Sequence, residues 1–222
     1  MSSRRLLCAW VVAWTAVPAL AQDPVKVDPH VKVEFENAQV RVTRQTYPAG
    51  FTAPTHTHAL PSATVDLTDS KQRADDGTVN ERKRWASRFS EPNTVPHKAV
   101  YLTASESIRV ELKGPAGASI PVPSTNATVV DPAHHKVEFE NDRIRIVRMT
   151  YPAGYKNPMH SHLPGVSIAL TATGVHTWSA DGKETDAQTV AHSASWSEGS
   201  THANEVRGKS PLELVRVELK TR

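Results

Sequence analysis

Two stretches decide the fold: VEFENAQVRVTRQTYPAG at residues 33–50 and VEFENDRIRIVRMTYPAG at residues 137–154. Twelve of their eighteen aligned positions are identical. The pentapeptide RVELK closes each copy, at residues 109–113 and 216–220. Identity that recurs in the same order indicates a duplicated domain. The sequence therefore predicts two related domains, at residues 25–113 and 131–222.

The pattern inside each copy predicts short β-strands. Residues 40–43 (VRVT), 144–147 (IRIV) and 212–219 (LELVRVEL) contain runs that alternate apolar and polar side chains, as a half-buried strand does. Tyr-Pro-Ala-Gly at 47–50 and 151–154, and Asp-Gly at 76–77 and 181–182, predict turns. No amphipathic helix is evident in the mature chain. About ninety residues of short strands favour an all-β jelly roll or small barrel in each copy.

The segment between the copies, residues 114–130, is GPAGASIPVPSTNATVV. It is rich in Pro, Ala, Ser and Thr and has no apolar period, so it is expected to be a linker or an arm lying across the neighbouring domain.

Residues 1–21 are typical of a secretory signal. Arg4 and Arg5 precede an apolar run that ends at Ala19-Leu20-Ala21. The run is shorter than the roughly 20 apolar residues of a membrane-spanning helix. We therefore expect a soluble, periplasmic or secreted protein that begins at Gln22, with no membrane association after cleavage; an uncleaved anchor is the alternative.

Charge and cysteine content limit the classes of partner. Removal of Arg4 and Arg5 leaves 24 basic residues against 23 acidic ones, so the mature chain offers no basic stripe for nucleic acid. The single cysteine, Cys8, lies in the expected signal, so a packed core rather than a disulfide must stabilise the mature protein.

Each copy carries a His-x-His pair followed by a third histidine. Residues i and i+2 of a strand point to the same face, so His160 and His162 are expected to converge, as are His56 and His58. The third histidines are His202 in the second copy and His97 in the first. Three imidazoles suit a divalent transition metal such as Fe, Mn, Ni, Cu or Zn. Two interpretations remain open: a metal is bound in at least one copy, or the site is vestigial and empty.

These motifs resemble the cupin superfamily. Gly154, five residues and His160-x-His162 resemble the first cupin signature, which Gly50 and His56-x-His58 repeat. The second signature, Pro-x-Gly-x-x-His, is matched in part by Gly199 and His202 and in part by Pro92 and His97. The chain thus resembles a bicupin, similar to the quercetin-dioxygenase-like cupins, and the resemblance implies two tandem jelly-roll barrels.

The sequence departs from the family pattern where a fourth, carboxylate ligand usually lies. Those positions hold Ser62 and Ala63 in the first copy, and Val166 and Ser167 in the second. The resemblance then implies a three-histidine site of the kind found in cupin-like dioxygenases. Ser197 and Thr94 also replace the proline and the glycine of the second signature in the two copies, which leaves the second copy the better match near its third histidine.

Other polar residues were assigned less specific positions. We expect the rim or surface for His176 and His192, solvent exposure for His134 and His135, and a strand face pointing away from the site for Glu205. Asp66 is either a substitute ligand or, as favoured, a solvated strand residue. The charged stretch from Lys71 to Arg88 reads as a solvated hairpin.

Three functions remain open at this point. The first is metal-dependent small-molecule chemistry, most simply dioxygenase-like; the second is non-catalytic binding of a small ligand or metal; the third is a structural module. Fold does not decide among them, because cupins host many activities. No general base can be assigned, and open sheet edges would allow a homodimer.

Overall fold

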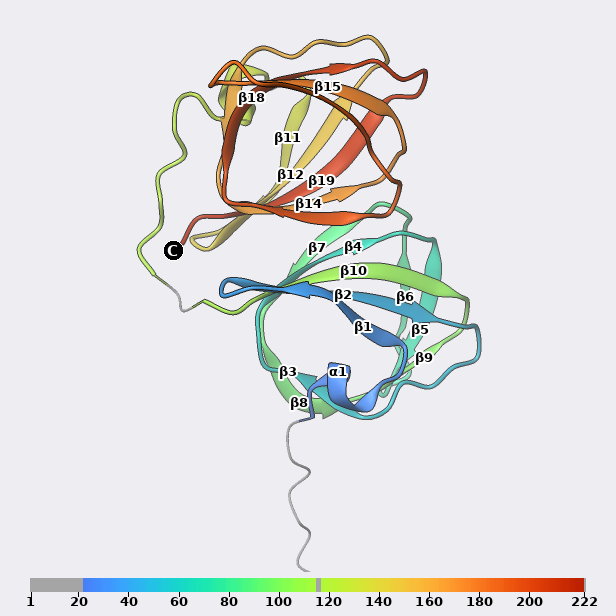
Figure 1. The fold of residues 1–222 in the computed structure, drawn as a ribbon. Coiled ribbons are helices and arrows are strands. Elements are labelled where there is room, and N and C mark those ends of the chain that lie inside the picture. The colour runs from blue at the N-terminus through green and yellow to red at the C-terminus, as the bar shows by residue number, and fades with distance from the viewer. Residues whose placement is uncertain (1–21, 115–116, 222) are drawn as a thin grey trace, which may run out of the picture.

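The computed structural model describes residues 22–114 and 117–221, so the expected signal at residues 1–21 lies outside the described residues. The chain folds into two β-barrels stacked one on the other (Figure 1). The first comprises α1 (Pro24–Val27), β1 (Val31–Glu36), β2 (Val40–Tyr47), β3 (His56–His58), β4 (Ser62–Asp66), β5 (Ser70–Ala74), β6 (Val79–Arg82), β7 (Ser87–Ser90), β8 (Asn93–His97), β9 (Ala99–Tyr101) and β10 (Ser105–Leu112). The second comprises α2 (Ala127–Val130), β11 (His135–Glu140), β12 (Ile144–Tyr151), β13 (His160–His162), β14 (Gly165–Ala169), β15 (Gly174–Ser179), β16 (Glu184–Gln188), β17 (Ala194–Ser197), β18 (Ser200–Val206) and β19 (Leu212–Leu219).

Each barrel is a jelly roll of one large sheet facing a smaller layer. The large sheets have equivalent strand orders, β1-β2-β10-β4-β7 and β11-β12-β19-β14-β17. The facing layer of the second barrel is the sheet β13-β18-β15-β16, whereas that of the first is split into β3-β8 and β6-β5-β9. The predicted all-β class is confirmed, and among the described residues helix is limited to the single turns α1 and α2. No helix within the described ranges is long and apolar enough to cross a membrane.

The predicted turns form for the expected reason. Gly50 and Gly154 have φ of 82° and 79°, and each occupies the third position of a turn that begins at the proline. Only glycine adopts this conformation without strain. The two Asp-Gly turns likewise place Gly77 and Gly182 at φ of 84°.

The expected linker includes a segment that packs on the second barrel. Thr125 accepts a backbone hydrogen bond from Ser161 of β13, and Asn126 caps the helix α2. Gln22 makes the matching bond to Thr57 of β3 in the first barrel. Residues 125–126 of the expected linker therefore lie against the second barrel, beside β13.

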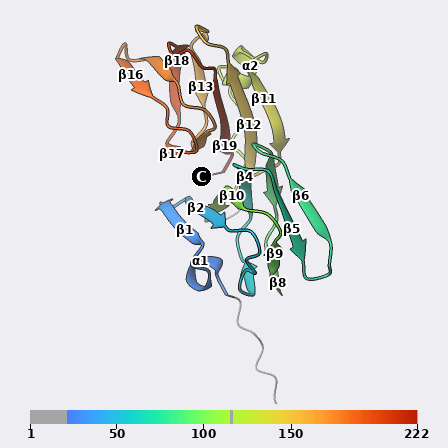
Figure 2. The same cartoon turned by 90° about the vertical axis from the view of Figure 1, so that its right-hand side faces the viewer.

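The main hydrophobic core lies between the two barrels. The outer faces of the large sheets contribute eight matched pairs of buried apolar residues: Val40 and Ile144, Val42 and Ile146, Ala63 and Val166, Val65 and Ile168, Leu67 and Leu170, Ile108 and Val215, Val110 and Val217, Leu112 and Leu219. In Figure 1 and Figure 2 the large sheets meet at the middle of the molecule, where the second barrel lies on the first. Phe89 and Phe139 stack at its edge with ring centroids 4.9 Å apart. The alternate residues of the same strands point into the barrels.

Two sequence expectations about charged residues were wrong. Asp66 is not solvated, because it is 3% exposed and pairs with Arg88 of β7. Arg88 therefore does not belong to a solvated hairpin. An acid placed next to a buried guanidinium avoids an unpaired charge, which explains why both side chains turn inward.

Replacing Ile146 by alanine tests the shared core. Because the side chain is fully buried between the barrels, we expect Ile146→Ala to lower the free energy of unfolding by about 2–5 kcal/mol. Urea unfolding followed by circular dichroism measures the change. Val190→Ala is the control, since Val190 is 65% exposed and its loss should change stability by less than about 0.5 kcal/mol. Equal effects of the two substitutions would contradict this account of the core.

Candidate metal centre

The predicted His-x-His pairs lie on β3 and β13, each in the smaller layer of its barrel. In the second barrel His160 lies directly opposite His202 of β18, and the ring centroids are 4.8 Å apart. The His162 ring lies 4.8 Å from that of His160 and 5.2 Å from that of His202. The structure thus brings the three expected histidines of this copy together.

The glycine of the second signature explains this close approach. Gly199 has φ of 102°, and a Cβ there would lie 3.0 Å from the carbonyl oxygen of His162. A side chain at this position would push β18 away from β13. The first barrel has Thr94 instead, and its β3–β8 pairing is irregular, with His56 opposite His97 but His58 opposite Asn93.

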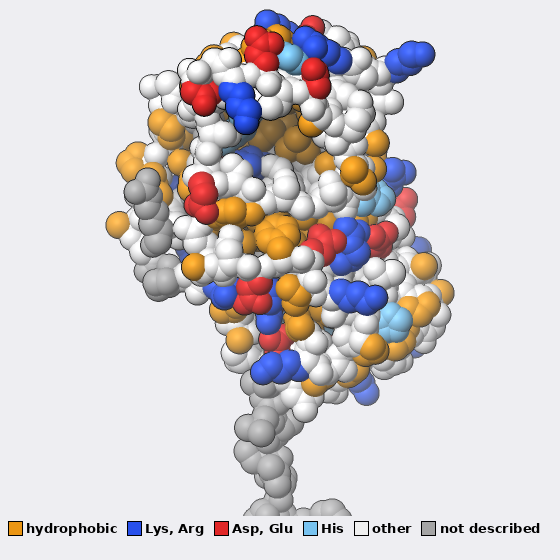
Figure 3. Space-filling model, in the orientation of Figure 1, with side chains coloured by type: hydrophobic (Ala, Val, Ile, Leu, Met, Phe, Trp, Pro, Cys, Tyr) orange, Lys and Arg blue, Asp and Glu red, His pale blue; other side chains and the backbone are white. Residues whose placement is uncertain are grey.

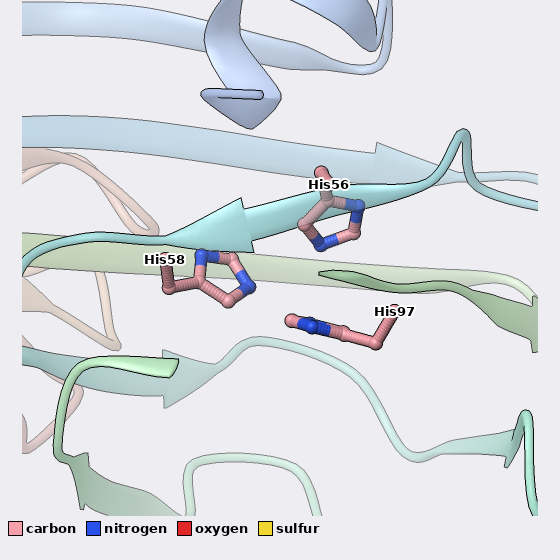
Figure 4. Close-up of side chains that lie close together, drawn as sticks. All are labelled: His56, His58 and His97. Atoms are coloured by element: carbon pink, nitrogen blue, oxygen red, sulfur yellow. The ribbon is translucent and has the colours of Figure 1, made fainter. Parts of the chain in front are cut away.

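The three histidines of the first barrel also point toward one another (Figure 4). Their ring centroids are separated by 4.7–5.2 Å, and one ring nitrogen of each lies within 4.8 Å of the others. All six sequence-predicted residues are therefore placed in two clusters, one per barrel.

A fourth histidine joins the second cluster. His135 is 3% exposed, and its ring centroid lies 5.2 Å from that of His160, so the expectation of solvent exposure was wrong for this residue. One nitrogen each of His135, His160 and His162 lies within 4.8 Å of the others. The same register position in β1 of the first barrel is Val31, which follows from the pairings Val31–Gln45 and His135–Met149. Aligning the two copies at this strand start would have revealed the difference.

The hydrogen bonds of the second cluster direct unprotonated nitrogens inward. Nδ1 of His160 lies 2.8 Å from the carbonyl of Pro158, and Nδ1 of His135 lies 2.8 Å from the carbonyl of Asp131. A carbonyl only accepts, so each Nδ1 carries the proton and each Nε2 is unprotonated. Nδ1 of His202 has Ser200 Oγ at 3.0 Å. Burial, followed by the neighbouring histidines, lowers the pKa of His202 to about 3, so its ring is neutral at physiological pH.

Glu218 orients His162 in the same sense. Its Oε1 lies 3.1 Å from Nδ1 of His162 and accepts the proton there. Burial raises the pKa of Glu218, but Arg216 and Arg145 lie 3.7 and 3.5 Å away and favour the carboxylate. Burial, followed by Arg216, holds the pKa of His162 well below its usual value. A carboxylate behind a ligating histidine is a common arrangement in metal sites.

These bonds leave two unprotonated nitrogens facing each other. Nε2 of His160 and Nε2 of His162 are 3.0 Å apart, and neither has a proton to share. Two imidazole nitrogens that each lie about 2.1 Å from one metal ion, at a right angle, are separated by about 3.0 Å. The donor set of the second barrel therefore fits a divalent transition metal.

The donor set of the first barrel fits less well. Nδ1 of His58 contacts Nη1 of Arg109, and a guanidinium can only donate. The proton of neutral His58 must then be on Nε2, the atom that would bind a metal. Burial, and next the charge of Arg109, lower the pKa of His58 to about 2. The ring is therefore neutral at physiological pH and carries only the proton on Nε2. Glu111, the counterpart of Glu218, turns away to Arg41 at 2.5 Å.

The remaining histidines and acids lie elsewhere. His176 is buried rather than at the surface, and its Nδ1 and Nε2 lie 2.8 and 3.1 Å from the carboxylates of Asp186 and Glu184. His192 is half-buried next to the first barrel, where its carbonyl accepts from Arg44. Glu205 bonds Arg207 on the outer side, as its strand position predicts. Asp66 belongs to neither cluster of possible ligands among the described residues.

Comparisons with known proteins support the fold. No protein-family model matches the sequence, and no curated protein matches it. Among solved structures, AerE from Microcystis aeruginosa aligns over 90% of this chain and 97% of its own, with a TM-score of 0.61 and 15% identity. Oxalate decarboxylase from Lactobacillus farciminis aligns over 87% and 84%, with a TM-score of 0.55 and 11% identity. A cupin 2 conserved barrel domain protein from Leptotrichia buccalis aligns over 86% and 88%, with a TM-score of 0.54 and 7% identity.

These likenesses span nearly the whole described chain, and at such low identity they concern the fold alone. They agree with the duplicated sequence, the paired jelly-roll barrels and the His-x-His strands at matching places. The chain therefore has the fold of the cupin superfamily, in its duplicated, bicupin form.

Proposed function

We propose that the chain is an exported, metal-dependent bicupin whose second barrel holds one divalent transition metal and acts on a small molecule in dioxygenase-like chemistry. The observation that carries the proposal is the pair of unprotonated nitrogens of His160 and His162, 3.0 Å apart in a buried site. His160, His162 and His202 would hold the ion. A metal bound there would supply a Lewis acid or redox centre with open positions for substrate and O₂.

A cavity gives a small molecule access to this site. It has a volume of about 280 Å³ and is lined by His162 and His202 together with Tyr151 and Arg216. His162 and His202 thus form part of both the metal cluster and the cavity wall. A ligand in the cavity would lie next to the metal, as chemistry at the metal requires.

His135 could supply a fourth imidazole. Its Nε2 accepts a hydrogen bond from the hydroxyl of Tyr151 at 2.5 Å, and burial raises the pKa of that hydroxyl, which keeps it protonated. In this arrangement Tyr151 occupies Nε2 of His135, and the hydroxyl would have to turn away for His135 to bind a metal. A fourth histidine would compensate for the carboxylate that the family pattern leads one to expect.

The alternative is non-catalytic binding of a small ligand or metal. One observation favours it: none of the described residues that line the cavity is Asp or Glu, so no carboxylate faces a ligand there as a general base. In this reading the metal or the ligand is held without turnover. The proposed function requires metal in the second barrel, whereas the alternative requires a metal or a small ligand.

Elemental analysis of the mature protein tests the metal site. We expect about one transition-metal ion per chain, bound by a single set of imidazole ligands. His160→Ala and His202→Ala should lose the ion, because each removes an inward-facing nitrogen. His56→Ala and His97→Ala are the matched controls in the first barrel and should retain it. Protein that stays free of metal after incubation with Fe, Mn, Ni, Cu and Zn would refute the proposal.

Glu218→Gln tests the carboxylate that orients His162. Because glutamine no longer holds the proton on Nδ1 by charge, we expect metal affinity to fall about 10- to 100-fold. Competition with a chromophoric chelator measures the affinity, and thermal melting checks that the variant is folded. The first-barrel counterpart, Glu111→Gln, should leave the affinity unchanged. The same loss in both variants would mean that the two barrels bind metal alike.

His135→Val tests the fourth histidine by installing the residue that the first barrel has at this register. If His135 binds the ion, we expect weaker metal binding with unchanged stoichiometry, because three imidazoles remain. His134→Ala is the control, since the neighbouring ring bonds Asp131 and lies outside the cluster. Unaltered affinity in His135→Val would remove His135 from the ligand set.

A further inference from the structure

The cavity of the second barrel has a predominantly apolar wall. Its lining includes Met149, Val175, Leu212 and Leu214, which pack together in one apolar cluster. In Figure 3 the second barrel, at the top, is hollowed, and hydrophobic side chains are visible inside the hollow. The polar lining residues include His162, His202 and Arg216, so the cavity has an apolar part and a polar part.

The first barrel shows that the fold does not require this apolar wall. By strand register, Met149 corresponds to Gln45 and Leu214 to Ser107. Those two residues bond each other, with Ser107 Oγ donating to Gln45 Oε1 at 3.1 Å. Leu212 corresponds to Ser105 in the same way. The same barrel architecture therefore forms with polar side chains at these three inward positions.

The interior of the first barrel is filled by its own side chains. Tyr47 stacks on Tyr101 with ring centroids 3.8 Å apart, and Asp66 pairs with Arg88. The second barrel has Ala169 and Ser195 at the register positions of Asp66 and Arg88. The ion pair of the first barrel therefore has no counterpart at these positions of the second.

Arg216 places a guanidinium in the wall of the cavity. The side chain is 5% exposed, donating from Nη1 to Ser167 Oγ and from Nη2 to the carbonyl of Leu163, both within 2.8 Å. Its Nε is buried and has no hydrogen-bond partner. Glu218 lies 3.7 Å from that nitrogen but bonds His162. Arg216 has five N–H donors, of which the bonds to Ser167 and Leu163 use two, and it lines the cavity, so its remaining donors are suited to an anionic oxygen.

We propose that the second barrel binds a small carboxylic acid with an apolar body, its carboxylate toward Arg216 and the histidines and its body against Met149, Leu212 and Leu214. Polar sugars and short diacids match the apolar part of the cavity poorly, because they would leave polar groups unpaired against Met149, Leu212 and Leu214. The inference rests on the proposed function only in placing the carboxylate beside the metal site. The apolar wall and Arg216 are independent of any metal.

Titration calorimetry with straight-chain acids tests the ligand class. The probes are butanoate, hexanoate and octanoate, with hexan-1-ol and oxalate for comparison, added to the full mature chain. Each methylene buried against the wall should strengthen binding about threefold to fourfold. Hexanoate should bind at least about tenfold more tightly than hexan-1-ol, because only the acid pairs with Arg216. Oxalate should bind more weakly than hexanoate.

A matched pair of variants locates the binding. Leu214→Ser installs the residue of the first barrel, and we expect it to weaken octanoate binding about tenfold while thermal melting reports a folded protein. Ser107→Leu, the reciprocal change in the first barrel, should leave octanoate binding unchanged. Equal losses in both variants would place the acid outside the second barrel and overturn the proposal.

Metal-free protein separates this inference from the proposed function. After chelator treatment the increase of affinity with chain length should persist, because the apolar wall remains. Affinity that is independent of chain length, or oxalate binding as tight as that of octanoate, would overturn the ligand class whether or not elemental analysis finds metal. Absence of metal together with intact chain-length dependence would refute the proposed function and leave this inference standing.

Discussion

The packing of the two large sheets against each other is the constraint on which the rest of the structure depends. Eight matched apolar positions from each copy form one core between the barrels. Strands of a sheet alternate their side chains, so the residues that stabilise this core cannot also line the barrels. The hydrophobic burial that holds the protein together is therefore separated from the barrel interiors, and the interiors are free to differ.

The interiors of the two barrels differ in polarity. The first is polar and internally paired, with Gln45 bonded to Ser107 and Asp66 paired with Arg88. The second has a smaller apolar cluster of its own, which includes Met149, Tyr151 and Leu212 beside a cavity. Because both barrels share strand order and register, the difference arises from side chains and not from a change of fold.

The histidine clusters differ through the residues behind them. In the first barrel Arg41 forms ion pairs with both Glu111 and Asp23. Glu111 is therefore turned away from His58, and Arg109 contacts the His58 ring instead. In the second barrel Asn126 stands at the position of Asp23 as a helix cap, and Glu218 bonds His162. The partner of Nδ1 is thus a carboxylate for His162 and a guanidinium for His58. This difference decides which ring nitrogen carries the proton, and therefore whether Nε2 can bind a metal.

The duplication made the fold and six of the clustered histidines predictable, because a repeated strand pattern and a His-x-His pair need only local periodicity. What the sequence did not reveal depends on contacts between distant segments. The sequence pattern places His135 before the first strand of the second copy and so predicts exposure, but the β11–β12 register turns it into the barrel, where Val31 lies in the other copy. Asp66 and His176 look like surface residues until their partners on other strands are known. The more informative comparison for this chain is therefore the one between its own two halves: with the fold held constant, an inward difference such as Met149 against Gln45 cannot be explained by stability of the barrel alone and points to what the second barrel contains.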